Sequence, residues 1–220
     1  MAIDSVVIGF GYRARSGKDT AVAEILAKRG LRGDIVKTGE HTYHIEGYDI
    51  CRYAFADALK REVSEEADKA GGMEKLFAPN YCFPKKGYVM TLPDWVKYDP
   101  DDEKNRTLHQ WWGTEYRRSD DESYWVRQVA EQIEREKPQY ALLSDMRFPN
   151  EMKFAKQHGF TVRVDRPGLP PATHASETAL ENVEGWDYLL DNSGTLESFQ
   201  EGAVALFDDV VTSFGYGHGV

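Results

Sequence analysis

The chain has 220 residues, and its 27 lysine and arginine residues are outnumbered by 37 aspartate and glutamate residues, which gives a formal charge of −10 at pH 7. An acidic chain is a poor candidate for binding duplex nucleic acid, because neutralisation of phosphates dominates that affinity. The length predicts a single domain, residues 1–220, with insertions, since domains typically run ~100–200 residues, and the 41% apolar content is enough for a core.

The cysteines and the apolar runs bear on the compartment. Cys51 and Cys82 form no CxxC pair and favour a reducing compartment. The first residues lack the basic-then-apolar pattern of a secretion signal, and no apolar run approaches the ~18 residues of a membrane helix. We therefore expect a soluble, cytoplasmic protein that binds neither membrane nor nucleic acid.

The first motif joins a predicted strand to a predicted helix. The apolar run Val6–Ile8 leads into two glycines and a basic loop that ends in RSGKDT, and a helical pattern covers residues 21–28. This is the layout of a phosphate-binding P-loop, in which backbone N–H groups and a helix N-terminus surround a polyphosphate. An ordinary strand–turn–helix connection is the alternative. We expect the donor nucleotide to be bound by Arg15, Ser16, Gly17, Lys18, Asp19 and Thr20.

The motif departs from the usual G-x-x-x-x-G-K-[ST] pattern at two positions. Tyr12 stands where the first glycine is expected, so either Gly11 serves in a loop one residue longer or Tyr12 accepts the turn. Asp19 replaces the hydroxyl residue that normally meets Mg²⁺. Its carboxylate could hold the metal directly or through water, with Thr20 facing the phosphates.

The predicted elements then alternate along the chain. A β-hairpin is expected at 34–50, a strand at 51–56, a helix at 58–69 and a substrate-binding insertion with short helices at 73–106. Helices at 107–112, 124–137, 151–158 and 196–214 interleave with strands at 140–144, 161–164 and 188–190, and a Pro/Gly-rich, lid-like loop covers 165–178. Strands that alternate with helices predict a parallel sheet with helices on both faces.

Ligands of such sheets bind beyond the carboxyl ends of the strands, so charged residues there are candidates. Asp57 could orient or deprotonate an acceptor, or cap its helix. Lys60 could meet an acceptor phosphate or lie at the surface. Asp145 ends an apolar run, as does the aspartate near Mg²⁺ in P-loop enzymes, and Arg147 suits planar phosphate recognition. These last two residues could also simply pair with each other.

The segment QWWGTEYRR, residues 110–118, is unusual because it holds two adjacent tryptophans. Both should not face one core on a helix, so one, such as Trp112, is expected to border a pocket and stack on a base. The alternative is that the pair packs between the domain and the insertion. Gln110 and Thr114 could bond base edges, and Arg118 could hold an acceptor phosphate.

The lid-like loop and the last strand supply the remaining candidates. Arg163 or Arg166 could close over the phosphates and exclude water. His174 is a weak metal candidate, because no second histidine lies at ligand spacing. Asn192 could contact the purine of the donor, or merely form an Asx-turn.

Six segments, in chain order, resemble the bacteriophage-type deoxynucleoside monophosphate kinases: RSGKDT, FADALK, LHQWWGTEYRR followed by YWV, SDMRFPNE, HASET and DNSGTLESF. The resemblance implies the P-loop kinase fold, a three-layer α/β/α arrangement around a central parallel sheet. It also implies transfer of the ATP γ-phosphoryl group to a dNMP with Mg²⁺. By this resemblance Lys18 holds the donor phosphates, Asp57, Arg118 and Arg147 serve the acceptor, and the residues that line or brace that site are Gln110, Trp125, Asn150 and Glu151.

The combined hypothesis is an ATP:dNMP phosphotransferase, with catalytic roles for Lys18, Asp57, Arg147 and Arg166 and a metal at Asp19 and Asp145. The remaining substrate contacts fall on Lys60, Gln110, Trp112, Thr114, Arg118, Trp125, Asn150 and Glu151, with Asn192 on the donor. Base preference is expected in or beside the insertion. The rivals are another small-molecule P-loop kinase, acting on dephospho-coenzyme A or phosphomevalonate, and a non-catalytic ATP-binding module. ATP and a dNMP are the predicted partners, with a homodimer left open.

Overall fold

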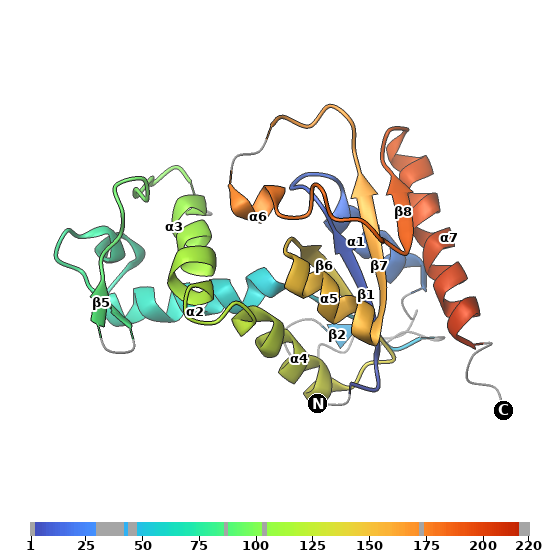
Figure 1. Ribbon diagram of the computed structural model, residues 1–220, viewed down its shortest axis with the longest axis horizontal. Helices are drawn as coiled ribbons and strands as arrows, with labels where there is room; N and C mark the ends of the chain where they lie inside the picture. The colour runs from blue at the N-terminus through green and yellow to red at the C-terminus, as the bar shows by residue number, and fades with distance from the viewer. Residues whose placement is uncertain are drawn as a thin grey trace. The chain divides into compact units, whose positions relative to one another are not determined.

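The chain folds into two compact units in the computed structural model, which describes residues 3–29, 42–43, 48–85, 88–102, 105–171 and 174–215 (Figure 1). Unit 1 comprises Met1–Phe55 and Val126–Val220, and unit 2 comprises Ala56–Trp125. Unit 2 is therefore one continuous insertion into unit 1. The insertion predicted at 73–106 lies within it.

Unit 1 is built on a six-stranded sheet with the strand order β2-β3-β6-β1-β7-β8. The parallel strands are β1 (Val6–Gly11), β3 (Ile50–Tyr53), β6 (Tyr140–Met146), β7 (Gly159–Asp165) and β8 (Tyr188–Asp191). A short strand, β2 (Thr42–Tyr43), pairs with β3 in the antiparallel direction at one edge. Every residue of β1 is buried, because strands pair with both of its edges and helices cover both of its faces.

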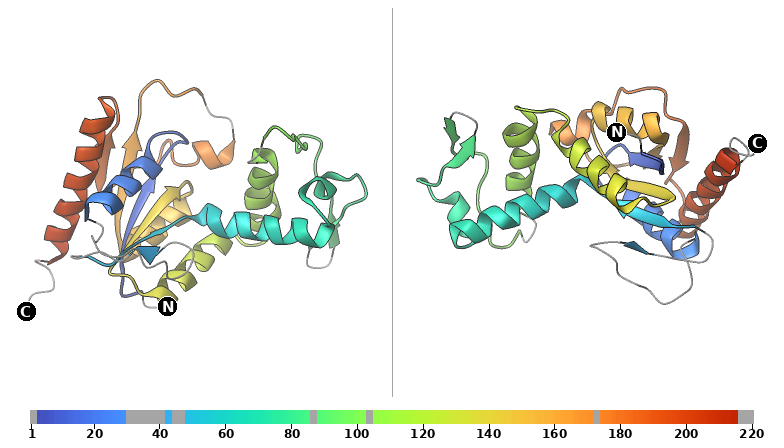
Figure 2. Two further views of the ribbon diagram at one scale, coloured as in Figure 1. Left: turned by 180° about the vertical axis from the view of Figure 1, so that it is seen from behind. Right: turned by 90° about the horizontal axis from the view of Figure 1, so that it is seen from below.

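Helices cover the two faces of this sheet. α1 (Lys18–Arg29) and α7 (Leu196–Gly215) lie on one face, and α5 (Pro149–His158) lies on the other with the unit 1 part of α4 (Tyr124–Glu136) (Figure 2, right). Alternate residues of β1 divide between them: Phe10 joins the core with α1 and α7, whereas a Cβ on Gly9 would come within 2.8 Å of Ala155 in α5. The predicted three-layer α/β/α arrangement around a central, mainly parallel sheet is confirmed.

The boundaries of the predicted elements shift in informative places. β6 continues to Met146, so Asp145 lies within the strand and not after it. α2 (Phe55–Ala70) begins earlier than predicted, because the Asp145 Oδ1 atom accepts a hydrogen bond from the N–H of Phe55 at 2.8 Å. Most of the hairpin expected at 34–50 lies outside the described residues. Within its described part, β2 pairs with the core strand β3.

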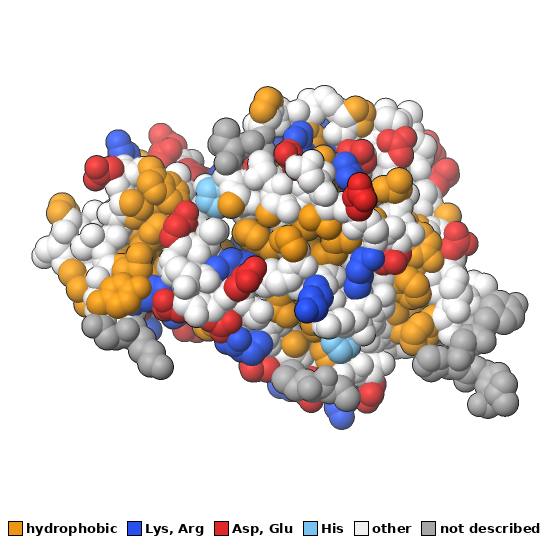
Figure 3. Space-filling model, viewed as in Figure 1, with side chains coloured by type: hydrophobic (Ala, Val, Ile, Leu, Met, Phe, Trp, Pro, Cys, Tyr) orange, Lys and Arg blue, Asp and Glu red, His pale blue; other side chains and the backbone are white. Residues whose placement is uncertain are grey.

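Unit 2 has an aromatic core. It contains most of α2, a 3₁₀ turn η1 (Met73–Phe77), an antiparallel pair β4 (Phe83–Lys85) and β5 (Tyr88–Met90), α3 (Arg106–Trp111) and a π-helical segment η2 (Trp112–Arg118). Phe83 packs edge-on against Trp111 and Trp112, at centroid distances of 5.1 and 5.6 Å. Hydrophobic side chains also lie at the surface of this unit (Figure 3); the most exposed are Tyr88 and Val89 of β5, Trp95 and Tyr98.

The β4–β5 pair differs from the short helices expected for the insertion. Each of its strands has only three residues, which is too short for an alternating pattern to be recognised. Within the described ranges, none of the helices combines the length and apolar character needed to cross a membrane.

Candidate functional site

The loop between β1 and α1 has the backbone shape of an anion-binding loop. Tyr12, Arg15 and Gly17 have positive φ angles of 101°, 61° and 112°. Turns that bring residues into this region let successive N–H groups converge on an anion. Of the two alternatives for the first glycine slot, the structure therefore has Tyr12 accepting the turn. Gly17 itself has no room for a side chain, since a Cβ would lie 2.6 Å from Nδ2 of Asn192.

Tyr12 is held in this strained backbone conformation by cations. The guanidinium of Arg163, on β7, lies 4.0 Å from the centroid of the Tyr12 ring, and that of Arg13 lies 5.7 Å from it. Arg163 reaches the ring because it pairs in register with Gly11, the residue before Tyr12. Cation–π contacts of this kind contribute about 0.5–2 kcal/mol. Of the two lid arginines, Arg163 thus packs under the loop, while Arg166 donates to the Arg15 carbonyl at 3.3 Å.

Lys18 is buried inside the loop, with 4% of its surface exposed. Its ammonium donates to three loop oxygens: the Ser16 hydroxyl at 3.3 Å, the Tyr12 carbonyl at 3.5 Å and the Arg13 carbonyl. Burial and, to a smaller extent, the positive charge of Arg147 together lower the pKa of Lys18 to about 8, against the opposing effect of Asp145, Asp19 and Glu177. A desolvated ammonium with a guanidinium nearby favours the binding of an anion.

The segment after β6 is fixed by a buried glutamate. Glu151 is 2% exposed, and its Oε2 atom accepts from the N–H groups of Arg147 and Phe148 at 2.6 and 3.0 Å. This carboxylate caps α5 and sets the backbone that carries Arg147, whose Nη1 atom donates to the Ser176 carbonyl at 3.5 Å. Glu151 therefore braces the Arg147 segment, and Asn150 lies in the first turn of the same helix.

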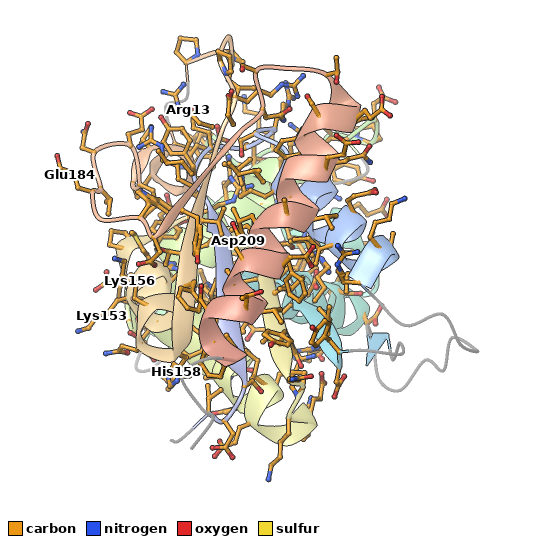
Figure 4. All side chains as sticks on the ribbon, turned by 90° about the vertical axis from the view of Figure 1, so that its right-hand side faces the viewer. Arg13, Lys153, Lys156, His158, Glu184 and Asp209 are labelled. Atoms are coloured by element: carbon orange, nitrogen blue, oxygen red, sulfur yellow. The ribbon has the colours of Figure 1, made fainter. Side chains whose placement is uncertain are left out.

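The β7–β8 connection, residues 166–187, is anchored on the P-loop at several points. Glu181 forms an ion pair with Arg13, and the Trp186 ring lies so close to Gly11 that a Cβ there would come within 2.6 Å of Cη2. In Figure 4, Arg13 lies at the end of the sheet that carries these loops. His158, the last residue of α5, lies at the other end of the sheet. The segment that follows the predicted lid-like loop is thus packed against the loop between β1 and α1.

Two predicted residues of this region have structural partners. His174 caps the short helix α6 (Ala175–Thr178), because its Nδ1 atom accepts from the Ser176 N–H at 3.2 Å. Asn192 donates from Nδ2 to the Ser16 carbonyl at 2.8 Å and so supports the loop from behind; its purine contact stays a prediction. In the parts of the chain that the structure describes, no group of three or more His, Cys, Asp or Glu side chains could hold a metal ion.

The remaining predicted residues belong to unit 2. Asp57 lies in the first turn of α2, where its Oδ1 atom is 3.6 Å from the Lys60 ammonium. Arg118 donates from Nη1 to the Glu122 carbonyl at 3.0 Å, and Gln110 and Thr114 are partly exposed.

The structure differs from the prediction that one of the two adjacent tryptophans borders a pocket. Trp111 and Trp112 are each 2% exposed, so both face one core and neither presents a face to a base. The prediction assumed α-helical spacing, but the helix widens at Trp112 into η2, where residues five apart share a face. Trp125 is 3% exposed and donates from Nε1 to the Gly113 carbonyl at 3.0 Å. Both Trp112 and Trp125 therefore brace η2.

Sequence reasoning missed Glu62, Glu181 and Trp186. Glu181 and Trp186 lie far along the chain from the loop they contact, and no local pattern marks them. Glu62 left a weak signal, since it follows Ala58 and precedes Glu66 at four-residue spacing on the inward face of α2. Acidic residues at partly buried helical positions indicate polar or cationic partners.

Comparisons with known proteins bear on this arrangement. No family model matches the chain. A protein of Acanthamoeba polyphaga mimivirus named "Putative deoxynucleotide monophosphate kinase" is 28% identical over 189 residues, which cover 79% of this chain and 91% of that protein. The chain resembles a deoxynucleotide monophosphate kinase. Among solved structures, dephospho-CoA kinase from Campylobacter jejuni aligns with a TM-score of 0.45 and 11% identity, over 94% of this chain and 97% of that one.

Proposed function

We propose that the protein is an ATP-dependent deoxynucleoside monophosphate kinase, which converts ATP and a dNMP into ADP and a dNDP. The mimivirus relative and the P-loop support a small-molecule P-loop kinase, that is, a phosphotransferase. The motifs and the name of that relative support the choice of acceptor. The observation that carries the proposal is the buried Lys18 ammonium. It donates hydrogen bonds to oxygens of its own loop, and the Arg147 guanidinium is near enough to lower its pKa.

Positioning and charge neutralisation would supply most of the rate, as is usual for phosphoryl transfer. Lys18 and the amides at the start of α1 would bind the donor phosphates, whose oxygens would replace the loop oxygens around the ammonium. An oxygen of the acceptor phosphate then attacks the γ-phosphorus, and the bond from that phosphorus to the β,γ-bridging oxygen breaks. Arg166 would neutralise charge on the transferred group. Arg147 would hold the acceptor phosphate in line, and Asp57 would orient the acceptor.

A magnesium ion would add charge neutralisation across the donor phosphates. Asp19 and Asp145 are the residues proposed to hold it. Both carboxylates are near enough to Lys18 to raise its pKa against the effect of burial, and carboxylate oxygens are the protein ligands that Mg²⁺ prefers. The remaining acceptor contacts proposed from the sequence are Lys60, Gln110, Thr114 and Arg118.

A substrate panel tests the proposal. All dNMPs and NMPs are offered with ATP, and ADP release is followed in a coupled assay. We expect acceptor-dependent ADP release with at least one dNMP, and a loss of roughly 10²–10³ in kcat for Lys18→Ala. Lys28→Ala is the matched control, because Lys28 lies on the same helix with 57% of its side chain exposed and should leave turnover unchanged.

The other outcomes separate the rival functions. Turnover of dephospho-coenzyme A or phosphomevalonate, with no dNMP accepted, would establish a different small-molecule kinase. Tight binding of ATP without acceptor-dependent ADP release would identify a non-catalytic module. A near-normal kcat for Lys18→Ala would remove Lys18 from the mechanism.

A further inference from the structure

One carboxylate on α2 accepts hydrogen bonds from two other segments of unit 2. Glu62 accepts from Nε1 of Trp112 at 3.0 Å, from Nε of Arg117 at 2.7 Å and from the hydroxyl of Tyr124. Trp112 and Arg117 belong to η2, and Tyr124 is the first residue of α4. The Glu62 side chain, which is 17% exposed, therefore ties η2 and the start of α4 to α2.

The spacing of these donors explains why η2 is π-helical. Trp112 and Arg117 are five residues apart, and in a π-helical turn residues i and i+5 lie one above the other. Trp111 and Tyr116 repeat this spacing with rings stacked at 5.3 Å and 23°, and the Tyr116 ring also lies 4.8 Å from Trp112 at a tilted 56°. In an α-helix the residue above Trp112 would be Tyr116, and Arg117 would turn away from Glu62. The bonds to Glu62 thus favour the π form.

The adjacent face of η2 carries residues proposed to bind the acceptor. Gly113 and Arg118 are also five apart; the Gly113 carbonyl accepts from Trp125, and Arg118 donates to the Glu122 carbonyl. Relaxation of η2 to an α-helix would rotate the residues after Trp112 by one position, about 100°. That rotation would move Arg118 off its present direction and would change the partner of Trp125.

We infer that Glu62 is a positioning residue, which holds η2 in its π form and thereby aims Arg118 and Thr114 at the acceptor nucleotide. The inference rests on the proposed function, because that function gives these two side chains a ligand. Glu62 itself bonds to protein groups and has no role at the reacting atoms. Its removal should therefore affect the acceptor KM far more than the ATP KM.

The test compares Glu62→Gln with Glu66→Gln in the full chain. Glu66 is a close match, because it lies one turn further along α2, is 15% exposed and bonds to the Tyr81 hydroxyl at 2.8 Å and to Lys69. Both variants are assayed for the KM of each substrate and by NMR of the five tryptophan indole N–H groups. Trp112→Phe assigns the Trp112 resonance by removing it.

We expect Glu62→Gln to raise the acceptor KM by about tenfold or more, with the ATP KM changed less than about twofold. The Trp112 and Trp125 indole resonances should both shift, because rotation of η2 moves the Gly113 carbonyl. Glu66→Gln should change none of these. An acceptor KM within twofold of wild type, or a shift confined to Trp112, would overturn the inference.

If Glu62→Gln does not fold, Trp112→Phe serves instead, since it removes one of the same bonds without changing charge; an unmoved Trp125 resonance and an unchanged acceptor KM in that variant would overturn the inference. If the wild-type protein phosphorylates no dNMP, the proposed function has failed and the acceptor role fails with it. The Trp125 resonance of Glu62→Gln then decides the structural claim alone.

Discussion

Tyr12 makes a sharp test of the P-loop, because it occupies a backbone region that glycine favours, with φ at 101°. The perturbation is a pair of substitutions, Tyr12→Gly and Tyr12→Ala. Both remove the contact of the ring with Arg163, so their difference in stability isolates the backbone. Only glycine adopts the left-handed region at no steric cost.

Two opposing effects set the difference in stability between Tyr12→Gly and Tyr12→Ala. Relief of the left-handed conformation favours glycine over alanine by about 1–2 kcal/mol. The greater freedom of glycine in the unfolded chain opposes this by about 0.4–1 kcal/mol. We therefore expect Tyr12→Gly to be more stable than Tyr12→Ala by roughly 0.5–1 kcal/mol. If Tyr12 had an ordinary negative φ, Tyr12→Ala would instead be the more stable variant. The two hypotheses for the backbone conformation at Tyr12 therefore predict opposite signs for the stability difference between the variants.

Urea unfolding measures the difference from the midpoints, provided that the two variants share one slope. Ala78→Gly supplies the control, because Ala78 has φ at −64° and should lose about 0.4–1 kcal/mol on substitution. If Tyr12→Ala proves as stable as Tyr12→Gly or more so, Tyr12 does not occupy the glycine position of the loop. The longer loop built on Gly11 would then be correct.

Two further predictions concern the same loop. Because the pKa of Lys18 is about 8, binding of ATP at pH 8 should take up about half a proton, as the phosphates restore the positive charge of the ammonium. Calorimetry in buffers of different ionisation enthalpy measures this proton uptake. The uptake should vanish in Lys18→Met, and in the wild-type protein at pH 6. In the free protein this lowered pKa costs stability below pH 8, and the cost disappears as the pH rises toward 10.5. Glu181→Gln removes the ion pair with Arg13, so amides of residues 175–183 should exchange roughly two- to fivefold faster, whereas Glu184→Gln should leave them unchanged. Equal exchange in both variants would contradict the anchoring role of Glu181.

The parts of the fold that local sequence determines were predicted well. The run Val6–Ile8, the glycine loop and the helix after it form β1, the P-loop and α1, because hydrophobic period and turn residues act over a few positions. The confirmed resemblance depends on motifs of the same kind. Strand order and register follow from packing across the whole sheet, and alternation predicted only that the strands would be parallel.

The errors have a common physical origin. Trp111 and Trp112 were assigned to different surroundings on the assumption of 3.6 residues per turn, and tertiary bonds to Glu62 favour a different period. The Arg163 contact that supports Tyr12 joins residues 151 positions apart. Side-chain networks of this type become visible only when distant segments have been brought together.

The continuity of unit 2 has an evolutionary consequence. Residues 56–125 enter the chain between β3 and β6, and within the described ranges they contribute their own two-stranded sheet and no strand to the six-stranded one. Recombination could therefore exchange this cassette in a single event without re-pairing any strand around the phosphate loop. Under the proposed function, new acceptor preferences would arise by replacement of one gene segment, while the machinery for using ATP is inherited unchanged.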